Sequence, residues 1–178
     1  MEKILLKSWP DGMPLKLDFP DKPLHMIHSM NRPIYTGTTN VMMSRFDTGT
    51  AIKAINDFRC TAWASITTIN VAVVNFPDIE RYNLGSLKRC SSGGAPIPRE
   101  ILQKWREIVG TELVEGYGLS ESISQTHVNP ISSPRYGSVG IPQFGVECRI
   151  VDLDTQRELA IGREGELMIK AGLERKRN

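Results

Sequence analysis

Residues 91–121, SSGGAPIPREILQKWREIVGTELVEGYGLSE, decide the fold of this chain. The stretch opens with a glycine-rich turn, continues into an amphipathic segment and closes on a second glycine-rich turn. Pro98 suits the first turn of a helix and Gly110 suits its C-terminal cap, so the segment predicts a helix over 98–109. A short strand over 112–115 is expected next. The helix carries one apolar stripe, made of Ile101, Leu102, Trp105, Ile108 and Val109.

Upstream of this helix, the pattern predicts alternating strands and helices. A short apolar run over 40–43 fits a buried strand, and Asp47 or Thr48 can cap a following helix. Residues 61–65 predict a second strand. Residues 66–75 fit two structures, because β-branched side chains favour a strand while the length also suits a helix. The apolar face of the first helix consists of Ile52, Ile55 and Phe58.

Downstream, the pattern changes to strands alone. Residues 146–150 and 166–170 both alternate apolar and polar side chains, which predicts a hairpin with one exposed face. The expected fold class is therefore α/β, a layered sheet with helices that leads into a small β subdomain. Five prolines over 8–33 instead favour an extended N-terminal arm, which we assign to residues 1–29.

Composition excludes several classes of function. A net charge of +2 gives no basis for binding nucleic acid or an anionic membrane surface. Neither a signal peptide nor an apolar stretch of about 18 residues is present, so no transmembrane segment is expected. Three widely spaced cysteines fit reduced thiols, and a cytoplasmic location is expected. His25 and His28 share a possible helix face, but no third ligand lies near them in the sequence.

Three glycine-containing segments stand out, over 91–96, 115–121 and 162–167. The first lacks bulky side chains, so a flat ring could lie against its backbone. The second supplies Tyr117 to stack on a base, Ser120 to hydrogen-bond a phosphate and Glu121 to hold Mg²⁺. Any one of these segments alone is better explained as an ordinary turn. Ser120 lacks the G-x-S-x-G surroundings of a hydrolase nucleophile. His127 could act as a base or contact the substrate, but a structural role in a loop explains it at least as well.

The order and spacing of the motifs are more specific. Ser-Gly-Gly-Ala-Pro, an amphipathic helix, and a strand ending in Tyr-Gly-Leu-Ser-Glu closely resemble the adenylate-forming superfamily, and Gly137–Pro142 and the Gly-Glu-Leu segment follow in the same order. Within that superfamily, the chain is most similar to acyl-CoA synthetases, in particular long-chain-fatty-acid–CoA ligases. Leu113–Glu121, followed by Thr126–Pro130, carries most of this likeness, which extends over roughly residues 30–172.

The resemblance implies a partial large N-terminal domain of an adenylate-forming enzyme and a role in fatty-acid metabolism. Its activity would be activation of a fatty acid or another carboxylic acid by ATP to an acyl-adenylate, then transfer to CoA. By motif, the adenine would be lined by Gly94, Ala95 and Pro96 and stacked by Tyr117. The resemblance further implies that Ser120, where threonine is usual, contacts phosphate, that Glu121 ligates Mg²⁺ as a catalytic residue alongside Ser120, and that Gly118 borders the acyl pocket.

The chain departs from the family in three places. Thr36-Gly37-Thr38-Thr39 is not followed by Pro-Lys-Gly, so we interpret it as a false phosphate loop that leads into a strand and an acidic helix cap. Residues 64–68, ASITT, replace a turn that contains proline and glycine. Domain 30–178 is thus expected to be a partial AMP-binding domain with no C-terminal lysine domain. We expect such an internally shortened chain to be incompetent alone.

Two functional classes remain open from the sequence. The chain is either a ligase by descent that carries part of an adenylate site, or a non-catalytic scaffold or interaction module derived from such a ligase. Restoration of activity by a protein supplying the missing parts favours the first class, and nucleotide-independent partner binding favours the second. The sequence leaves open the acyl chain specificity and the oligomeric state.

Overall fold

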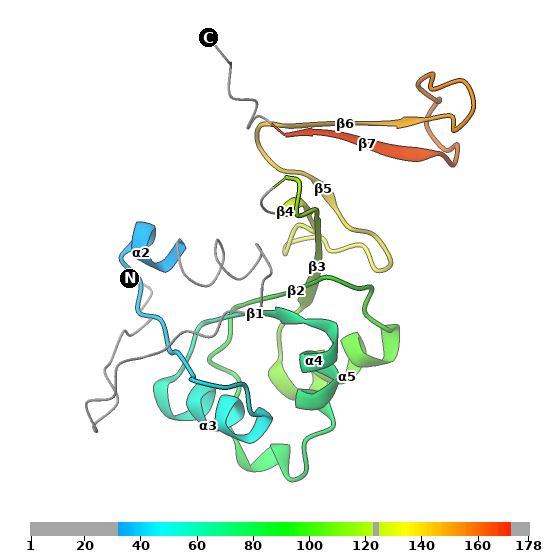
Figure 1. Ribbon diagram of the computed structural model, residues 1–178. Helices are drawn as coiled ribbons and strands as arrows, with labels where there is room; N and C mark the ends of the chain where they lie inside the picture. The colour runs from blue at the N-terminus through cyan, green and yellow to red at the C-terminus, as the bar shows by residue number, and fades with distance from the viewer. Residues whose placement is uncertain (1–31, 123–124, 172–178) are drawn as a thin grey trace.

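The computed structural model describes residues 32–122 and 125–171 (Figure 1). The predicted arm over 1–29 and the histidines at 25 and 28 lie outside the described residues. The helices are α2 (Arg32–Thr36), α3 (Thr48–Phe58), α4 (Thr67–Val74), the 3-10 turn η2 (Ile79–Arg81) and α5 (Arg99–Val109). The strands are β1 (Ala62–Ile66), β2 (Arg89–Gly93), β3 (Leu113–Gly118), β4 (Gln125–Val128), β5 (Ile141–Pro142), β6 (Val146–Val151) and β7 (Glu166–Ala171).

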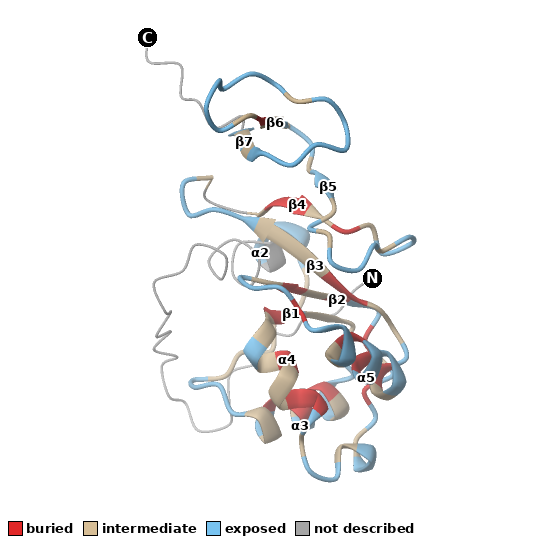
Figure 2. Ribbon diagram, turned by 90° about the vertical axis from the view of Figure 1, so that its right-hand side faces the viewer, coloured by how far each residue is buried: buried red, intermediate tan, exposed pale blue. Residues whose placement is uncertain are grey.

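A five-stranded sheet runs in the order β1-β2-β3-β4-β5. The first three strands are parallel, and β4 and β5 add to them antiparallel. Helix α4 connects β1 to β2, and α5 connects β2 to β3. Because successive parallel strands add on the same side and such crossovers are right-handed, both helices lie on one face of the sheet. Figure 2 shows α3, α4 and α5 together on that face.

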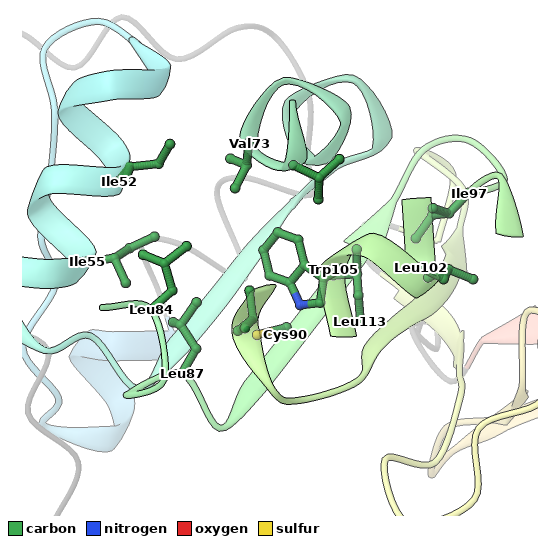
Figure 3. Packing of buried hydrophobic residues seen from close by; sticks show 12 residues of the cluster. Ile52, Ile55, Val73, Leu84, Leu87, Cys90, Ile97, Leu102, Trp105 and Leu113 are labelled. Carbon is green, nitrogen blue, oxygen red and sulfur yellow. The ribbon is translucent and has the colours of Figure 1, made fainter. Parts of the chain in front are cut away.

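The hydrophobic core lies between these helices and β1–β3 (Figure 3). Trp105 of α5 is fully buried at its centre, and its ring stacks on Trp63 of β1 with 6.5 Å between ring centroids. Helix α3 contributes the buried side chains of Ile52 and Ile55. The other buried members of the cluster are Val73, Val74, Leu84, Leu87, Cys90, Ile97, Leu102, Val109 and Leu113.

Helix termini follow the predicted capping chemistry. Asp47 is the N-cap of α3, and its Oδ1 accepts a hydrogen bond from the Thr50 N–H at 2.7 Å. Gly110 ends α5 in the left-handed region, with φ +79°, where a side chain would be strained. Pro98 is the N-cap of α5 and precedes its first helical residue. Both predicted helices are therefore confirmed, with one correction: Phe58, which the spacing placed on the apolar face with Ile52 and Ile55, is the last residue of α3 and is 47% exposed.

Three local predictions are corrected by the structure. The run over 40–43 forms no strand; its three apolar side chains are only half-buried, and no described strand pairs with it. The interpretation of residues 36–39 as leading into this strand is wrong because the strand does not form. The acidic helix cap expected after it, Asp47, is present. The segment 66–75, for which the sequence left strand and helix open, is resolved: Ile66 ends β1, residues 67–74 form α4, and Asn75 is the C-cap. The strand predicted over 112–115 continues through the glycines to Gly118, because β4 supplies hydrogen-bonding partners there.

The hairpin formed by β6 and β7 stands apart from the core, at the opposite end of the molecule from α3 (Figure 1). Its six-residue register runs from Val146 opposite Ala171 to Val151 opposite Glu166, as the alternating pattern predicts. Among residues 146–151 and 166–170, the part of the hairpin strands whose burial is described, only Val151 is fully buried. None of the described helices has the length and hydropathy required to cross a bilayer.

Candidate functional site

The first glycine loop lies between the end of β2 and the start of α5. Gly94, Ala95 and Pro96 are all exposed, whereas Ile97 directly after them is buried in the core. Gly94 has φ +83°, a conformation that favours glycine and lets the chain leave the strand sharply. The loop therefore presents its backbone at the surface while Ile97 anchors its far end.

The second motif begins within β3. Tyr117 is half-buried near the end of this strand, and Gly118 beyond it is exposed. The Tyr117 ring meets the His127 ring of β4 edge-on, with 6.1 Å between centroids and 65° between planes. His127 thus supports one side of the aromatic ring. No other aromatic ring of the described residues contacts Tyr117.

A tight turn carries Ser120 and Glu121 beyond β3. Ser122 closes this turn twice: its hydroxyl donates to the Leu119 carbonyl oxygen at 2.8 Å, and its Oγ accepts from the Leu119 N–H at 3.2 Å. Ser120 and Glu121 are exposed at the tip. Neither side chain hydrogen-bonds or ion-pairs with another described residue. Both are thus placed to meet a ligand from solvent.

Parallel pairing brings the two motifs to one edge of the sheet. β2 and β3 are neighbours, with Ser92 opposite Glu115, so the loop after β2 lies beside the last residues of β3. A side chain joins them directly, because Oε1 of Glu115 accepts a hydrogen bond from the Ile97 N–H at 2.8 Å. The carboxyl ends of strands in open α/β sheets are the usual place for ligands.

The end of β1 also reaches the first loop. Thr67, the first residue of α4, donates its hydroxyl hydrogen to the Ala95 carbonyl oxygen at 2.8 Å. Across β1 and β2, Ile66 lies opposite Gly93 in the register. Three successive strand ends therefore meet at the exposed loop over 94–96. The unusual segment 64–68 is the end of β1 and the start of α4.

A bulge re-aims β4 beside Tyr117. Tyr117 pairs with His127 and Gly118 pairs with Gln125, so Thr126 is the additional residue. The Thr126 hydroxyl donates to the Tyr117 carbonyl oxygen at 3.3 Å, and its Oγ1 lies 3.0 Å from Nδ1 of His127. Which of these two atoms donates depends on the tautomer of the ring. Burial lowers the pKa of His127, so the ring is neutral at pH 7.

His127 was expected in a loop if structural, and the structure places it in β4. It is buried, with 3% of its surface exposed. The strand position follows from the pairing of β3 beyond residue 115, which the sequence pattern did not predict. The residue packs against the site from within the sheet. Its chemical role as a base or substrate contact stays a prediction.

Metal-binding capacity in this region rests on one carboxylate. No group of three or more His, Cys, Asp or Glu residues within 32–122 and 125–171 is arranged to hold a metal ion. Mg²⁺ is commonly held by one or two carboxylates together with substrate phosphates and water. The exposed Glu121 fits that donor set, whereas it does not fit a resident, fully protein-ligated ion.

The third glycine segment belongs to the hairpin and not to this region. A Cβ on Gly165 would lie 2.3 Å from the Val151 carbonyl oxygen, so this glycine serves close packing of β6 and β7. Glu164 and Glu166 are exposed, as predicted. Gly162 has φ +87° and allows the turn. This motif therefore identifies the fold and contributes no group to the region around Tyr117.

Sequence reasoning missed the residues that hold the two motifs in place. Glu115, Thr67, Ser122 and Thr126 all bond to the site backbone or close its turns. Ser122 carried a local signal, because serine hydroxyls often bond to backbone groups three or four residues earlier in the chain. Glu115 and Thr67 carried no local signal, because their hydrogen-bond partners, Ile97 and Ala95, lie 18 and 28 residues away in the sequence.

Comparison with known proteins places this geometry in a family. The family model described as AMP-binding enzyme matches residues 23–172. A long-chain-fatty-acid–CoA ligase of Bacillus subtilis (strain 168) is 34% identical over 142 residues, which are 79% of this chain and 25% of that protein. The 4-coumarate–CoA ligase-like 6 protein of Oryza sativa subsp. japonica is 36% identical over 156 residues, 83% of this chain and 26% of its own. The chain thus spans about a quarter of these relatives.

Solved structures show the same fold. An anthranilate CoA ligase in complex with anthranoyl-AMP superposes with a TM-score of 0.77 at 23% identity, covering 84% of this chain and 29% of that one. A long-chain-fatty-acid-CoA ligase from Archaeoglobus fulgidus gives a TM-score of 0.72 at 21% identity, covering 83% and 33%. The α/β architecture with a mixed sheet matches the N-terminal domain of adenylate-forming CoA ligases. The chain belongs to the AMP-binding enzyme family.

Proposed function

We propose that the described residues form the adenylate-binding part of an acid–CoA ligase that activates a long-chain fatty acid. In this reaction a carboxylate oxygen attacks the α-phosphorus of ATP, the bond to pyrophosphate breaks, and an acyl-adenylate forms. The sulfur of CoA then attacks the acyl carbonyl carbon, loses its proton, and displaces AMP. Such catalysis depends on positioning and charge neutralisation, so the phosphate contacts matter most.

The observation that carries this proposal is the meeting of the two glycine motifs at the ends of β2 and β3, joined by Glu115 and Ile97. In the proposal, Gly94, Ala95 and Pro96 line the adenine and the ring of Tyr117 stacks on it. The exposed backbone of the loop and the half-buried ring support these roles.

The remaining roles follow the turn after β3. In the proposal, Ser120 donates a hydrogen bond to a phosphate oxygen, and Glu121 ligates Mg²⁺ together with the phosphates. When bound, Mg²⁺ would neutralise the charge that develops on the phosphate oxygens. Gly118 borders the acyl chain, where the missing side chain leaves room. Their exposure on a turn closed by Ser122 supports this assignment.

The choice of a fatty acid rests on one relative, because other similar proteins are named for 4-coumarate. Both are carboxylic acids, so the chemistry at the carboxylate is shared. We propose a cytoplasmic location as well, which the free thiols of Cys60, Cys90 and Cys148 support. The domain assignment of residues 30–178 as one partial AMP-binding domain is part of the same proposal.

A thermal melt of the purified chain tests the proposal. A non-hydrolysable acyl-adenylate analogue with Mg²⁺, at 100 times its dissociation constant, should add about 2.7 kcal/mol of stability. Tyr117→Ala should abolish the shift by removing the stacking face. Glu121→Gln should leave AMP binding intact and remove the dependence on Mg²⁺. Matched long-chain and aromatic acyl-adenylates then compare the two substrate classes.

The outcome that contradicts the proposal is a cooperative melt that no adenylate shifts. Such a result, with nucleotide-independent binding of a protein partner, would assign the chain to the scaffold class instead. A shift that is equal in Tyr117→Ala would show that the ligand binds elsewhere.

A further inference from the structure

Two side chains hydrogen-bond to the backbone of the exposed glycine loop, one on each side of Pro96. The carbonyl oxygen of Ala95, before the proline, accepts from the Thr67 hydroxyl at 2.8 Å. The N–H of Ile97, after the proline, donates to the Glu115 carboxylate at 2.8 Å. Pro96 itself has no N–H to donate, so the loop is held here through the backbone groups of its two neighbours.

The residues that supply these two side chains belong to different parts of the sheet layer. Thr67 follows β1 at the start of α4, and Glu115 lies within β3. The loop emerges from β2, which lies between those strands. Its backbone is therefore held from both neighbours, and a shift of either strand end would be transmitted to it.

Glu115 also ties the loop to the rest of the site. Successive side chains of a strand point to opposite faces, so Glu115 and Tyr117 project from the same side of β3. The backbone carbonyl of Glu115 accepts from the Asn129 N–H at 3.0 Å, which connects β3 to the chain beyond β4. Glu115 is half-buried, and its carboxylate accepts a charge-assisted bond that is stronger than a neutral one.

From this geometry we infer that Thr67 and Glu115 are positioning residues that set the distance between the loop over 94–96 and the ring of Tyr117. This inference rests on the proposed function, in which the adenine lies between those two groups. Neither side chain touches the nucleotide; each acts through a backbone group of the loop. Removing either bond leaves the core intact and lets the loop move away from the ring.

The test measures AMP affinity of the full chain by calorimetry in matched variants. Thr67→Val keeps the shape and removes the hydroxyl, and should weaken AMP binding about three- to tenfold. Glu115→Leu removes the charge-assisted acceptor and should weaken it about tenfold or more. Thr67→Ser and Glu115→Gln keep an acceptor or donor in place and should restore affinity to within about twofold of the unmodified chain.

Two controls separate positioning from general damage. Thr68→Val changes the exposed residue next to Thr67 on α4, and Glu107→Leu removes an exposed carboxylate on α5; both should leave AMP affinity unchanged. Hydrogen exchange of the Ile97 amide should be slow in the unmodified chain and in Glu115→Gln, and fast in Glu115→Leu. If Glu115→Leu does not fold, Thr67→Val alone still decides the matter.

The inference is overturned if Thr67→Val and Glu115→Leu bind AMP as tightly as the unmodified chain. Equal loss in the conservative variants, or a lowered melting temperature with unchanged affinity, would also overturn it, since either would show a purely structural role. Failure of the proposed function gives a different result: the unmodified chain itself does not bind AMP, while the Ile97 amide stays protected.

Discussion

The two halves of this molecule are held together in different ways. The layer made by β1–β3 and helices α3–α5 buries a continuous cluster of twelve hydrophobic residues. Among its described residues, the part from β4 to β7 contributes one buried hydrophobic residue, Val151, and several of its large apolar side chains are exposed. Figure 2 shows most of this part in the colours of exposed and intermediate residues. Its order depends on strand pairing and on tight glycine turns. The candidate site lies where these two parts meet. Its loop over 94–96 belongs to the packed layer, and its turn after β3 leads into the paired strands.

This contrast predicts where large and small losses of stability occur. Trp105→Ala should cost about 3–5 kcal/mol, because it empties the centre of the packed layer. Phe144→Ala, at a fully exposed position beyond β5, should change stability by less than about 0.5 kcal/mol. Equilibrium urea denaturation followed by tryptophan fluorescence and circular dichroism measures both. Equal losses would show that the two halves are not packed differently.

The paired strands should instead be sensitive at glycines. A Cβ on Gly140 would lie 2.1 Å from the Val128 carbonyl oxygen, and φ there is +90°. Gly140→Ala should therefore cost about 3 kcal/mol, from overpacking and backbone strain together. Gly162→Ala meets no atom within 4 Å and should cost about 1 kcal/mol, from φ alone. Melting temperatures of the two variants give the comparison, and a reversed order would contradict it.

Acid should lower the stability of the protein through His127, which lies beside the candidate site. Burial lowers the pKa of this ring below its ordinary value of 6.5, so the unfolded chain binds the proton more tightly than the folded chain. The resulting stability is fully present above pH 6.5 and is lost as the pH falls below it, towards the folded-state pKa. Melts between pH 7.5 and 5 should show a drop that His127→Gln reduces. A pH dependence unchanged in that variant would assign the drop to other groups.

The smallest expected effect lies at the N-terminus of α3, in the packed layer. The Thr50 backbone and side chain hold the pKa of Asp47 below its ordinary value of 3.8. The stabilisation from this cap is present above about pH 4 and is lost as the pH falls through the folded-state pKa. Asp47→Asn keeps a capping acceptor that does not titrate. Acid melts below pH 4 should therefore differ less from neutral ones in Asp47→Asn, and identical curves would argue against the cap as a source of acid sensitivity.

Local rules predicted the packed layer well. The cap at Asp47, the stripe on 98–109 and the glycine at 110 act within one or two turns of helix, so the sequence contains them. The run over 40–43 failed because a strand also requires a neighbouring strand, which apolar character alone does not supply. The strand over 112–115 was predicted too short for the same reason: β4 extends it by pairing from a distant part of the chain.

The candidate site divides in a similar way. Its exposed groups, such as Tyr117 and Glu121, could be named from motif order and from the chemistry of their side chains. Their supports could not, because the bonds from Thr67 and Glu115 join residues far apart in the chain. Thr126 is a further case, since its place in the bulge depends on the register of β3 and β4 and not on its own neighbours.

The last strand of the sheet has a consequence for self-association. β5 is two residues long and ends on Pro142, which has no N–H to offer a further strand. An incoming chain therefore finds little to pair with on that side, and the sheet is protected from growing there. The opposite border, β1, has five residues without proline and lacks a described outer neighbour. Further strands should consequently add to the five-stranded sheet at β1, and a proline or lysine introduced there should slow that growth.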